Sequence, residues 1–203
     1  AFNQITGLSL FGKHILVIGC GPVGKGIAER ARSLGAIVRV SDLDPVRLLE
    51  ASHLGCEPVT LAEGLARSDI IVTATGVCDV LHAKHLSQVK SGAIVLNAGH
   101  SNREIDIDWL SRQPHRRVKA HIEQYNLGDK FIFLLGEGSL LNLASGTGPF
   151  GLDQFDHYTA VMLLGIAWMF EGIPEGIQPG LQRYPIHLER EIAEWSIRMK
   201  STR

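Results

Sequence analysis

The 203-residue sequence has little cysteine, little net charge and no long apolar run, and each shortage excludes a class of protein. Its three cysteines, Cys20, Cys56 and Cys78, are far apart and include no Cys-x-x-Cys pair, which argues against a disulfide framework and a zinc site. A formal net charge of -1 gives no footprint for nucleic acid or an anionic membrane. The most apolar window, residues 160–170, is far shorter than the roughly 20 residues of a membrane span. Without a recognisable signal peptide, we expect a cytoplasmic protein with no metal site, no nucleic-acid partner and no membrane partner.

A glycine-rich turn follows the first apolar run of the chain. Residues 15–18 read Ile-Leu-Val-Ile, and Gly19, Gly21 and Gly24 then have the spacing G-x-G-x-x-G. In a strand–turn–helix unit, the first glycine permits the tight turn, the second lets backbone N–H groups approach a pyrophosphate, and the third lets the helix pack close to the strand. The helix N-terminus adds unpaired donors and the positive end of its dipole. Because glycine-rich turns are common, the motif alone is a weak indication.

The acidic residue after the second expected strand strengthens the indication. Asp42 follows a strand expected over residues 36–41 and lies 18 residues after Gly24, close to the roughly 20 expected of an acid that bonds a ribose 2′-hydroxyl. An aspartate at this position favours NAD, because it would repel the 2′-phosphate of NADP. Capping of the next helix is the alternative role, but Asp44, directly before a proline, suits it better. Arg47 keeps NADP open, since a nearby arginine could accept a 2′-phosphate.

Alternating elements continue along the chain and predict an α/β fold, a doubly wound parallel sheet of Rossmann type. Two expected strands end in small polar segments, Thr73–Gly76 and Asn97–His100, and ligands bind at the carboxyl ends of such strands. The expected strands are 14–18, 36–41, 58–60, 69–73 and 93–96, and the expected helices are 23–34, 46–54 and 61–66.

The second part of the chain departs from this alternation. We expect a short helix over 106–111, a hairpin from 119–125 and 131–135 that closes the sheet, and an irregular glycine-rich stretch over 136–148. A buried helix to residue 170 and a last helix from about residue 186 form a helical extension. The chain reads as a single domain over 1–203, with a lead-in over 1–12 and a connector and C-terminal helix over 172–203.

Some candidate side chains have a plain structural alternative. His100 follows a strand at the ligand edge, where it could transfer a proton or orient a substrate, or it could be a polar residue leading into a helix. Glu104 and Asp106 are most simply explained by the start of a helix, and Cys78 by a small buried apolar role. A local basic run is expected to be a solvated face; it consists of Arg112, Arg116, Arg117 and Lys119.

The chain resembles the NAD-binding domain of the S-adenosyl-L-homocysteine hydrolase family from residue 11 to about 194. The matching segments are G-C-G-P-V-G-K-G, S-D-L-D-P, V-T-A-T-G, L-N-A-G-H-S-N-R-E-I-D, E-G-S-L-L-N-L and P-I-H-L-E-R-E-I-A-E. In that family, NAD oxidises the ribose 3′-hydroxyl of a nucleoside substrate, homocysteine is eliminated, water adds, and the ketone is reduced again. The resemblance implies pyrophosphate contacts from the glycine turn, ribose contacts from Asp42, and nicotinamide contacts near His100 and Asn142. The implied cofactor-binding set is Gly19, Gly21, Pro22, Val23, Gly24, Asp42, Arg47, Thr73, Thr75, Gly76, Ala98, Gly99, His100 and Asn142.

Departures from the family pattern limit what the resemblance implies. Pro22 stands where the family has an acid, Arg47 where it has an asparagine, and Pro149 where it has a second histidine. With about a dozen residues before the first strand, the family's substrate domain is expected to be absent, and with it the lysine and aspartates that transfer protons. We therefore expect a partner: a separate substrate domain or further copies of the chain. Three functions stay open: part of a hydrolase acting on a nucleoside-type substrate, a stand-alone NAD-dependent oxidoreductase, or a non-catalytic NAD sensor.

Overall fold

The computed structural model describes residues 1–100, 102–141, 152–171 and 180–201. The chain divides into two compact units, residues 1–148 and 149–203, and each unit is described by itself. These units are defined by the contacts within each of them, and the assignment of residues 1–203 to a single domain stays a prediction.

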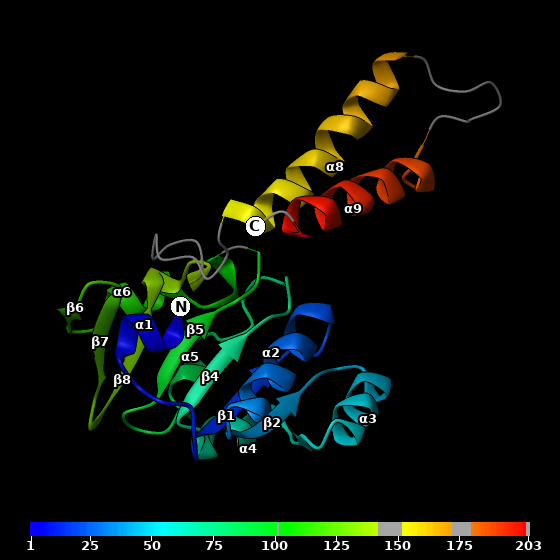
Figure 1. The fold of residues 1–203 in the computed structure, drawn as a ribbon. Coiled ribbons are helices and arrows are strands. Elements are labelled where there is room, and N and C mark those ends of the chain that lie inside the picture. The colour runs from blue at the N-terminus through cyan, green and yellow to red at the C-terminus, as the bar shows by residue number, and fades with distance from the viewer. Residues whose placement is uncertain (101, 142–151, 172–179, 202–203) are drawn as a thin grey trace. The chain divides into compact units, whose positions relative to one another are not determined.

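The first unit is built on a mixed sheet, to which the described residues contribute eight strands in the order β3-β2-β1-β4-β5-β8-β7-β6 (Figure 1). The strands from β3 to β5 are parallel, β8 continues the sheet parallel to β5, and β7 and β6 are antiparallel additions. This arrangement confirms the doubly wound α/β prediction and the predicted hairpin, which is formed by β7 and β8, but β6 rather than this hairpin closes the sheet. The strands are β1 (His14–Ile18), β2 (Ile37–Ser41), β3 (Glu57–Pro58), β4 (Ile70–Thr73), β5 (Ile94–Asn97), β6 (His115–Lys119), β7 (Ile122–Leu127) and β8 (Lys130–Leu135).

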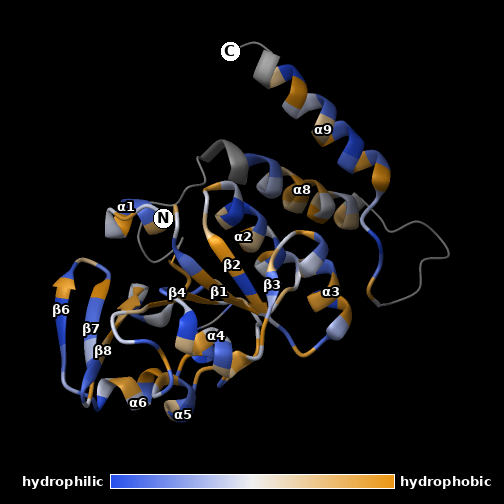
Figure 2. Cartoon of the chain, turned by 90° about the horizontal axis from the view of Figure 1, so that it is seen from below, coloured by the Kyte–Doolittle hydropathy of each residue, from blue (hydrophilic) through white to orange (hydrophobic). Residues whose placement is uncertain are grey.

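Helices cover both faces of this sheet (Figure 2). One core cluster joins α1, α2 and α3 to the sheet, and a second joins α4, α5 and α6 to its other face. Alternation along the strands explains the two clusters, because neighbouring side chains point to opposite faces: Ile15 and Val17 of β1 belong to the first cluster, Leu16 and Ile18 to the second. The helices are α1 (Phe2–Thr6), α2 (Pro22–Ser33), α3 (Pro45–His53), α4 (Leu61–Arg67), α5 (Ala83–Leu86) and α6 (Ile107–Ser111), with 3₁₀ turns η1 (Asn102–Glu104) and η2 (Gly136–Gly138).

The sequence pattern missed the elements that carry little apolar signal. β6 contains three of the four residues of the basic run, Arg116, Arg117 and Lys119, and all five residues of the strand are exposed. A charged edge strand protects the sheet from pairing with other chains, but it shows none of the apolar alternation that predicts a strand. The short helices α1 and α5 were also not predicted, and β3 has two residues rather than three. The other elements of this unit agree with expectation to within a few residues at their ends.

The second unit contains α8 (Leu152–Glu171) and α9 (Ile186–Ser201), which contact each other. Tyr184, before α9, donates its hydroxyl to the Val161 carbonyl of α8 at 2.9 Å. The prediction of a buried helix to residue 170 is wrong for the described side chains. Apolar residues of α8 such as Leu163 and Phe170 are exposed, Phe170 at 87%. An all-round apolar pattern indicates that a helix can be covered, but not what covers it. A search of the described residues finds no helix with the length and apolarity to cross a membrane.

Candidate functional site

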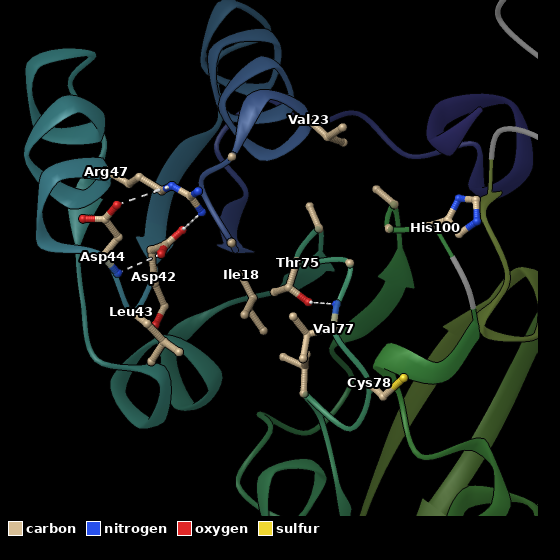
Figure 3. Close-up of a pocket in the computed structure, with 18 of the residues that line it drawn as sticks. Ile18, Val23, Asp42, Leu43, Asp44, Arg47, Thr75, Val77, Cys78 and His100 are labelled. Carbon is tan, nitrogen blue, oxygen red and sulfur yellow. Dashed lines mark hydrogen bonds and ion pairs between the residues drawn. The ribbon is translucent and has the colours of Figure 1, made fainter. Parts of the chain in front are cut away.

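A cavity of about 960 Å³ opens at the carboxyl ends of β1, β2, β4 and β5. It lies at the topological switch point of the sheet, where β1 has β2 as its neighbour on one side and β4 on the other. Ligands bind at this point in such folds. Figure 3 shows Asp42, Asp44 and Arg47 at one end of this cavity, Thr75 and Val77 near its middle, and His100 at the other end. The lining residues include Gly19, Gly21, Pro22, Val23, Asp42, Arg47, Thr75, Gly76, Cys78, Asp79, Ala98, Gly99 and His100.

The glycine turn has the geometry that its spacing predicts. Gly19 has φ +89°, a conformation that side chains disfavour, and its amide donates to the Ser41 carbonyl at 2.8 Å. A Cβ on Gly24 would lie 1.8 Å from the Gly19 carbonyl oxygen, so only glycine lets α2 come this close to β1. In front of Gly21 the space is open, because an added Cβ would meet only Arg47 Nη1, at 4.0 Å. Pro22 is the first residue of α2, and no side chain caps this helix N-terminus.

Asp42 is fixed at the end of β2 by the turn that it faces. Its Oδ2 accepts the Cys20 amide at 2.6 Å and its Oδ1 accepts the Asp44 amide at 2.9 Å. Burial alone would raise the pKa of Asp42, but these amide donors and the Arg47 guanidinium outweigh burial and hold the pKa below its ordinary value. The carboxylate is therefore ionised near neutral pH, and its remaining lone pairs can still accept ribose hydroxyls.

The structure also shows which aspartate caps α3 and how Arg47 is held. Asp44, not Asp42, caps α3, since its Oδ1 accepts the Val46 amide at 2.9 Å. Arg47 Nη1 lies 3.7 Å from Asp42 Oδ2, and Arg47 Nε lies 3.6 Å from Asp44 Oδ2. The guanidinium is thus drawn towards two carboxylates at the ribose end of the cavity. A 2′-phosphate would have to enter beside both negative charges, so this geometry favours NAD over NADP.

Glu104 anchors the loop after β4, a role that the sequence did not reveal. Its carboxylate accepts the Thr75 amide at 3.0 Å, the Thr75 hydroxyl at 2.9 Å and the Gly76 amide at 2.7 Å, and the residue is 1% exposed. Glu104 lies in the short turn η1, but its carboxylate bonds the loop after β4, so the expectation that a helix start explains its charge is wrong. It holds for Asp106, which accepts the Trp109 amide at the start of α6. A fully buried glutamate is rare, so its burial indicates a specific structural role, but that burial cannot be read from the sequence.

The ends of β4 and β5 are joined behind the cavity. Thr73 is fully buried and donates to Asn97 Oδ1 at 3.2 Å, and the same oxygen accepts the Gly99 amide at 2.6 Å. Thr73 therefore lies outside the cavity lining, and its carbonyl accepts the amide of the lining residue Ala98 at 2.8 Å. Ala98, Gly99 and His100 do line the cavity, with the His100 side chain exposed.

The structure corrects the expected burial of Cys78. Cys78 is exposed at the cavity rather than buried, because the loop after Gly76 leaves the sheet edge. All three cysteines, which lie in the described part of the chain, are free thiols. Asn142 lies outside the described residues.

The residues present fit NAD. The turn offers a cradle that a Cβ at Gly24 would block, the open space before Gly21 leads to an uncapped helix N-terminus, and an ionised Asp42 stands where an adenosine ribose would lie. Thr75–Gly76 and Ala98–His100 line the other half of the cavity. The fold and site together define an NAD-binding domain of Rossmann type.

Comparison with known proteins places the chain in a family. Residues 1–148 match the family model described as S-adenosyl-L-homocysteine hydrolase, NAD binding domain, and the chain belongs to this family. Its fold also resembles a solved structure of dipicolinate synthase from Bacillus halodurans, with a TM-score of 0.50 and 24% identity over 55% of this chain and 39% of that chain.

Curated proteins that are similar to this chain include relatives with two different names. Adenosylhomocysteinase of Archaeoglobus fulgidus is 36% identical over 96% of this chain and 48% of the relative. Adenosylhomocysteinase of Aeropyrum pernix is 42% identical over 71% of this chain and 36% of the relative. The S-inosyl-L-homocysteine hydrolase of Methanosarcina mazei is 41% identical over 72% and 36%. The chain spans about half the length, or less, of these relatives.

Proposed function

We propose that this chain is the NAD-binding part of a hydrolase that cleaves a nucleoside thioether of homocysteine after oxidising its ribose 3′-hydroxyl. One observation carries the proposal: a single cavity presents, in order, an ionised aspartate, a glycine turn at a helix N-terminus, and two polar strand ends. This order matches an adenosine ribose, a pyrophosphate and a nicotinamide riboside. NAD, when bound, supplies hydride acceptance and return.

The chain's own residues would divide the work along the cavity. The turn at Gly19 and Gly21 and the N-terminus of α2 would hold the pyrophosphate, and Asp42 would bond the adenosine ribose. Ala98, Gly99 and His100 would lie beside the nicotinamide, where the exposed His100 side chain can orient a substrate hydroxyl or carry its proton. Asn142, as the family resemblance implies, would bond the nicotinamide carboxamide.

The substrate's base stays open within this proposal. The relatives named for S-adenosyl and for S-inosyl substrates have similar identity to this chain, 36–42% for two of the former and 41% for one of the latter. The described cavity has one dinucleotide-sized site, and the half of the relatives that this chain does not span would supply the base contacts. A separate substrate domain, a homo-oligomer and a cytoplasmic location are part of the proposal, the last supported by three free thiols.

Calorimetric titration with NAD tests the proposal. The wild type should bind NAD, and Asp42→Ala should raise the Kd about tenfold or more, because hydrogen bonds to a charged acceptor contribute about 1.5–3 kcal/mol. Asp44→Asn is a matched control: it removes a charge at the same rim, keeps a good helix cap, and should change the Kd less than about threefold.

The outcomes of the titration are distinct. No binding of NAD by folded wild type, or equal binding by wild type and Asp42→Ala, would refute the site. Native mass spectrometry of the purified chain would add the assembly state and show any retained nucleotide. Monomeric protein at all concentrations, with or without NAD, would contradict the homo-oligomer.

A further inference from the structure

Glu104 places a buried carboxylate directly behind the cavity. Its three bonds come from uncharged donors, the amides of Thr75 and Gly76 and the Thr75 hydroxyl. Three donors converging on two oxygens is the arrangement that an ionised carboxylate accepts. These bonds orient the group and spread its charge, but none of them supplies a positive charge to cancel it.

A second loop also makes room for this carboxylate. A Cβ on Gly99 would lie 1.6 Å from Glu104 Oε1, so the backbone after β5 passes against the carboxylate at a distance that only glycine allows. Thr75, Gly76 and Gly99 all line the cavity, and Glu104 is 1% exposed behind them. The charge therefore lies one residue layer from the cavity and away from solvent.

The half of the cavity next to Glu104 is the nicotinamide half under the proposed function. Asp42 marks the adenosine ribose on the β2 side of the glycine turn, and the loops after β4 and β5 lie on the other side (Figure 3). The far end of a dinucleotide must then lie against Thr75–Gly76 and Ala98–His100. The nicotinamide ring at that end carries a positive charge in the oxidised cofactor and none in the reduced cofactor.

We propose that Glu104 makes this site bind oxidised nicotinamide dinucleotide more tightly than the reduced form, which lowers the reduction potential of the bound cofactor. This inference rests on the proposed function. A buried charge is screened less than an exposed one, so its attraction for the cationic ring persists at physiological salt. Asp79 and His100, which line this half, and Arg103, which precedes Glu104 in the chain, are all exposed to solvent, and the Asp42–Arg47–Asp44 group lies at the opposite half. Glu104 is thus a positioning residue that also sets the charge preference.

Dissociation constants of three ligands test the proposal in wild type and Glu104→Gln. The ligands are NAD⁺, NADH and ADP-ribose, which lacks the nicotinamide ring and so reports the rest of the site. We expect wild type to bind NAD⁺ about threefold more tightly than NADH, or better. In Glu104→Gln, the ratio of the NADH Kd to the NAD⁺ Kd should fall towards one. A loss of affinity caused by displacement of the loop should affect all three ligands equally and leave this ratio unchanged.

Asp79→Asn is the matched control, because it neutralises an exposed carboxylate on the same cavity, and asparagine tolerates the positive φ of 58° found there. Its NAD⁺ to NADH ratio should stay within about 1.5-fold of wild type, since solvent screens its charge. An equal fall of the ratio in both variants would contradict the assignment to the buried group.

Each result decides between distinct claims. Equal or tighter binding of NADH by wild type would overturn the inference without any variant, even if Glu104→Gln does not fold. An unchanged ratio in folded Glu104→Gln would show that the carboxylate only positions the loop, and would overturn it as well. Absence of binding of all three ligands by wild type would instead refute the proposed function.

Discussion

Replacing Gly24 with alanine is the sharpest test of how the glycine turn works. The added Cβ would lie 1.8 Å from the Gly19 carbonyl oxygen and 2.9 Å from the Gly19 carbonyl carbon, both of them backbone atoms that cannot rotate away. To reach even 3.0 Å, the start of α2 must move about 1.2 Å from β1. That movement loosens the packing of α2 on β1, and it shifts the helix N-terminus that faces the open space before Gly21.

Gly26 provides the control within the same helix. A Cβ at Gly26 has nothing within 4 Å, so Gly26→Ala should stabilise the protein by up to about 1 kcal/mol through helix propensity alone. Gly24→Ala receives the same propensity gain but suffers an overpacking penalty of about 3 kcal/mol, since the clash involves backbone. The net effect should be a loss of about 2 kcal/mol.

Thermal unfolding and NAD titration measure the two effects. For a chain of this size, a loss of about 2 kcal/mol lowers the Tm by about 4–8 °C, and Gly26→Ala should raise it slightly. The NAD Kd should increase at least about tenfold in Gly24→Ala, because the displaced helix dipole and amides no longer face the pyrophosphate. Equal stability of the two alanine variants, or unchanged NAD affinity in Gly24→Ala, would refute the close-approach argument.

Three further outcomes are expected. Burial would raise the pKa of Asp69, but Lys90 at 2.5 Å and the His14 amide at 3.0 Å outweigh burial and lower this pKa. The ionised carboxylate therefore stabilises the fold above about pH 4, and this contribution is lost as the pH falls through the lowered pKa. Asp69→Asn should therefore cost about 1.5 kcal/mol at pH 7, and urea unfolding should show the difference from wild type shrinking below pH 4; a constant difference down to pH 2 would contradict this. The exposed Cys78 should react with a maleimide, and bound NAD should slow the reaction. Cys20 and Cys56 are buried, which raises their pKa values, so they should stay unmodified in the folded protein. Peptide mass mapping measures the order of labelling, and labelling of Cys20 first would count against the fold around the turn. Gly99→Ala should lower the free energy of unfolding by at least about 2 kcal/mol, because the added Cβ would displace the Glu104 carboxylate and leave the Thr75 and Gly76 amides without their acceptor. A chemical-denaturation midpoint equal to that of wild type would show that the loop accommodates the added Cβ without displacing the carboxylate.

Features that depend on neighbours in the chain were predicted well. The alternation of apolar runs and helical stretches indicated the parallel sheet, whereas the order of its strands is known from the structure. The glycine spacing specified the close approach of α2 and β1, which the 1.8 Å clash at Gly24 confirms. Asp44 before a proline was correctly assigned as a helix cap, because capping involves only amides two or three residues away.

Features that depend on contacts between distant segments were not predictable in the same way. Glu104 was assigned to a helix start, since its charge is attractive there, yet it bonds residues 28 and 29 positions earlier in the chain. Cys78 was expected to be buried on its residue type alone, although the path of its loop decides its exposure. The helix α8 has the composition of a core helix, yet several of its apolar residues, such as Leu163 and Phe170, are exposed in the described unit.

The sequence by itself determined that a parallel sheet ends in a phosphate-binding turn with an acid beside it, because strand burial, glycine conformation and helix capping are governed by residues within one or two turns of each other. Only the tertiary structure decided which charged groups surround that turn. The sheet brings together the ends of β2, β4 and β5, which lie at positions 41, 73 and 97 of the chain. Burial then determines whether a carboxylate is screened, as at Asp79, or acts on the cavity, as we infer for Glu104.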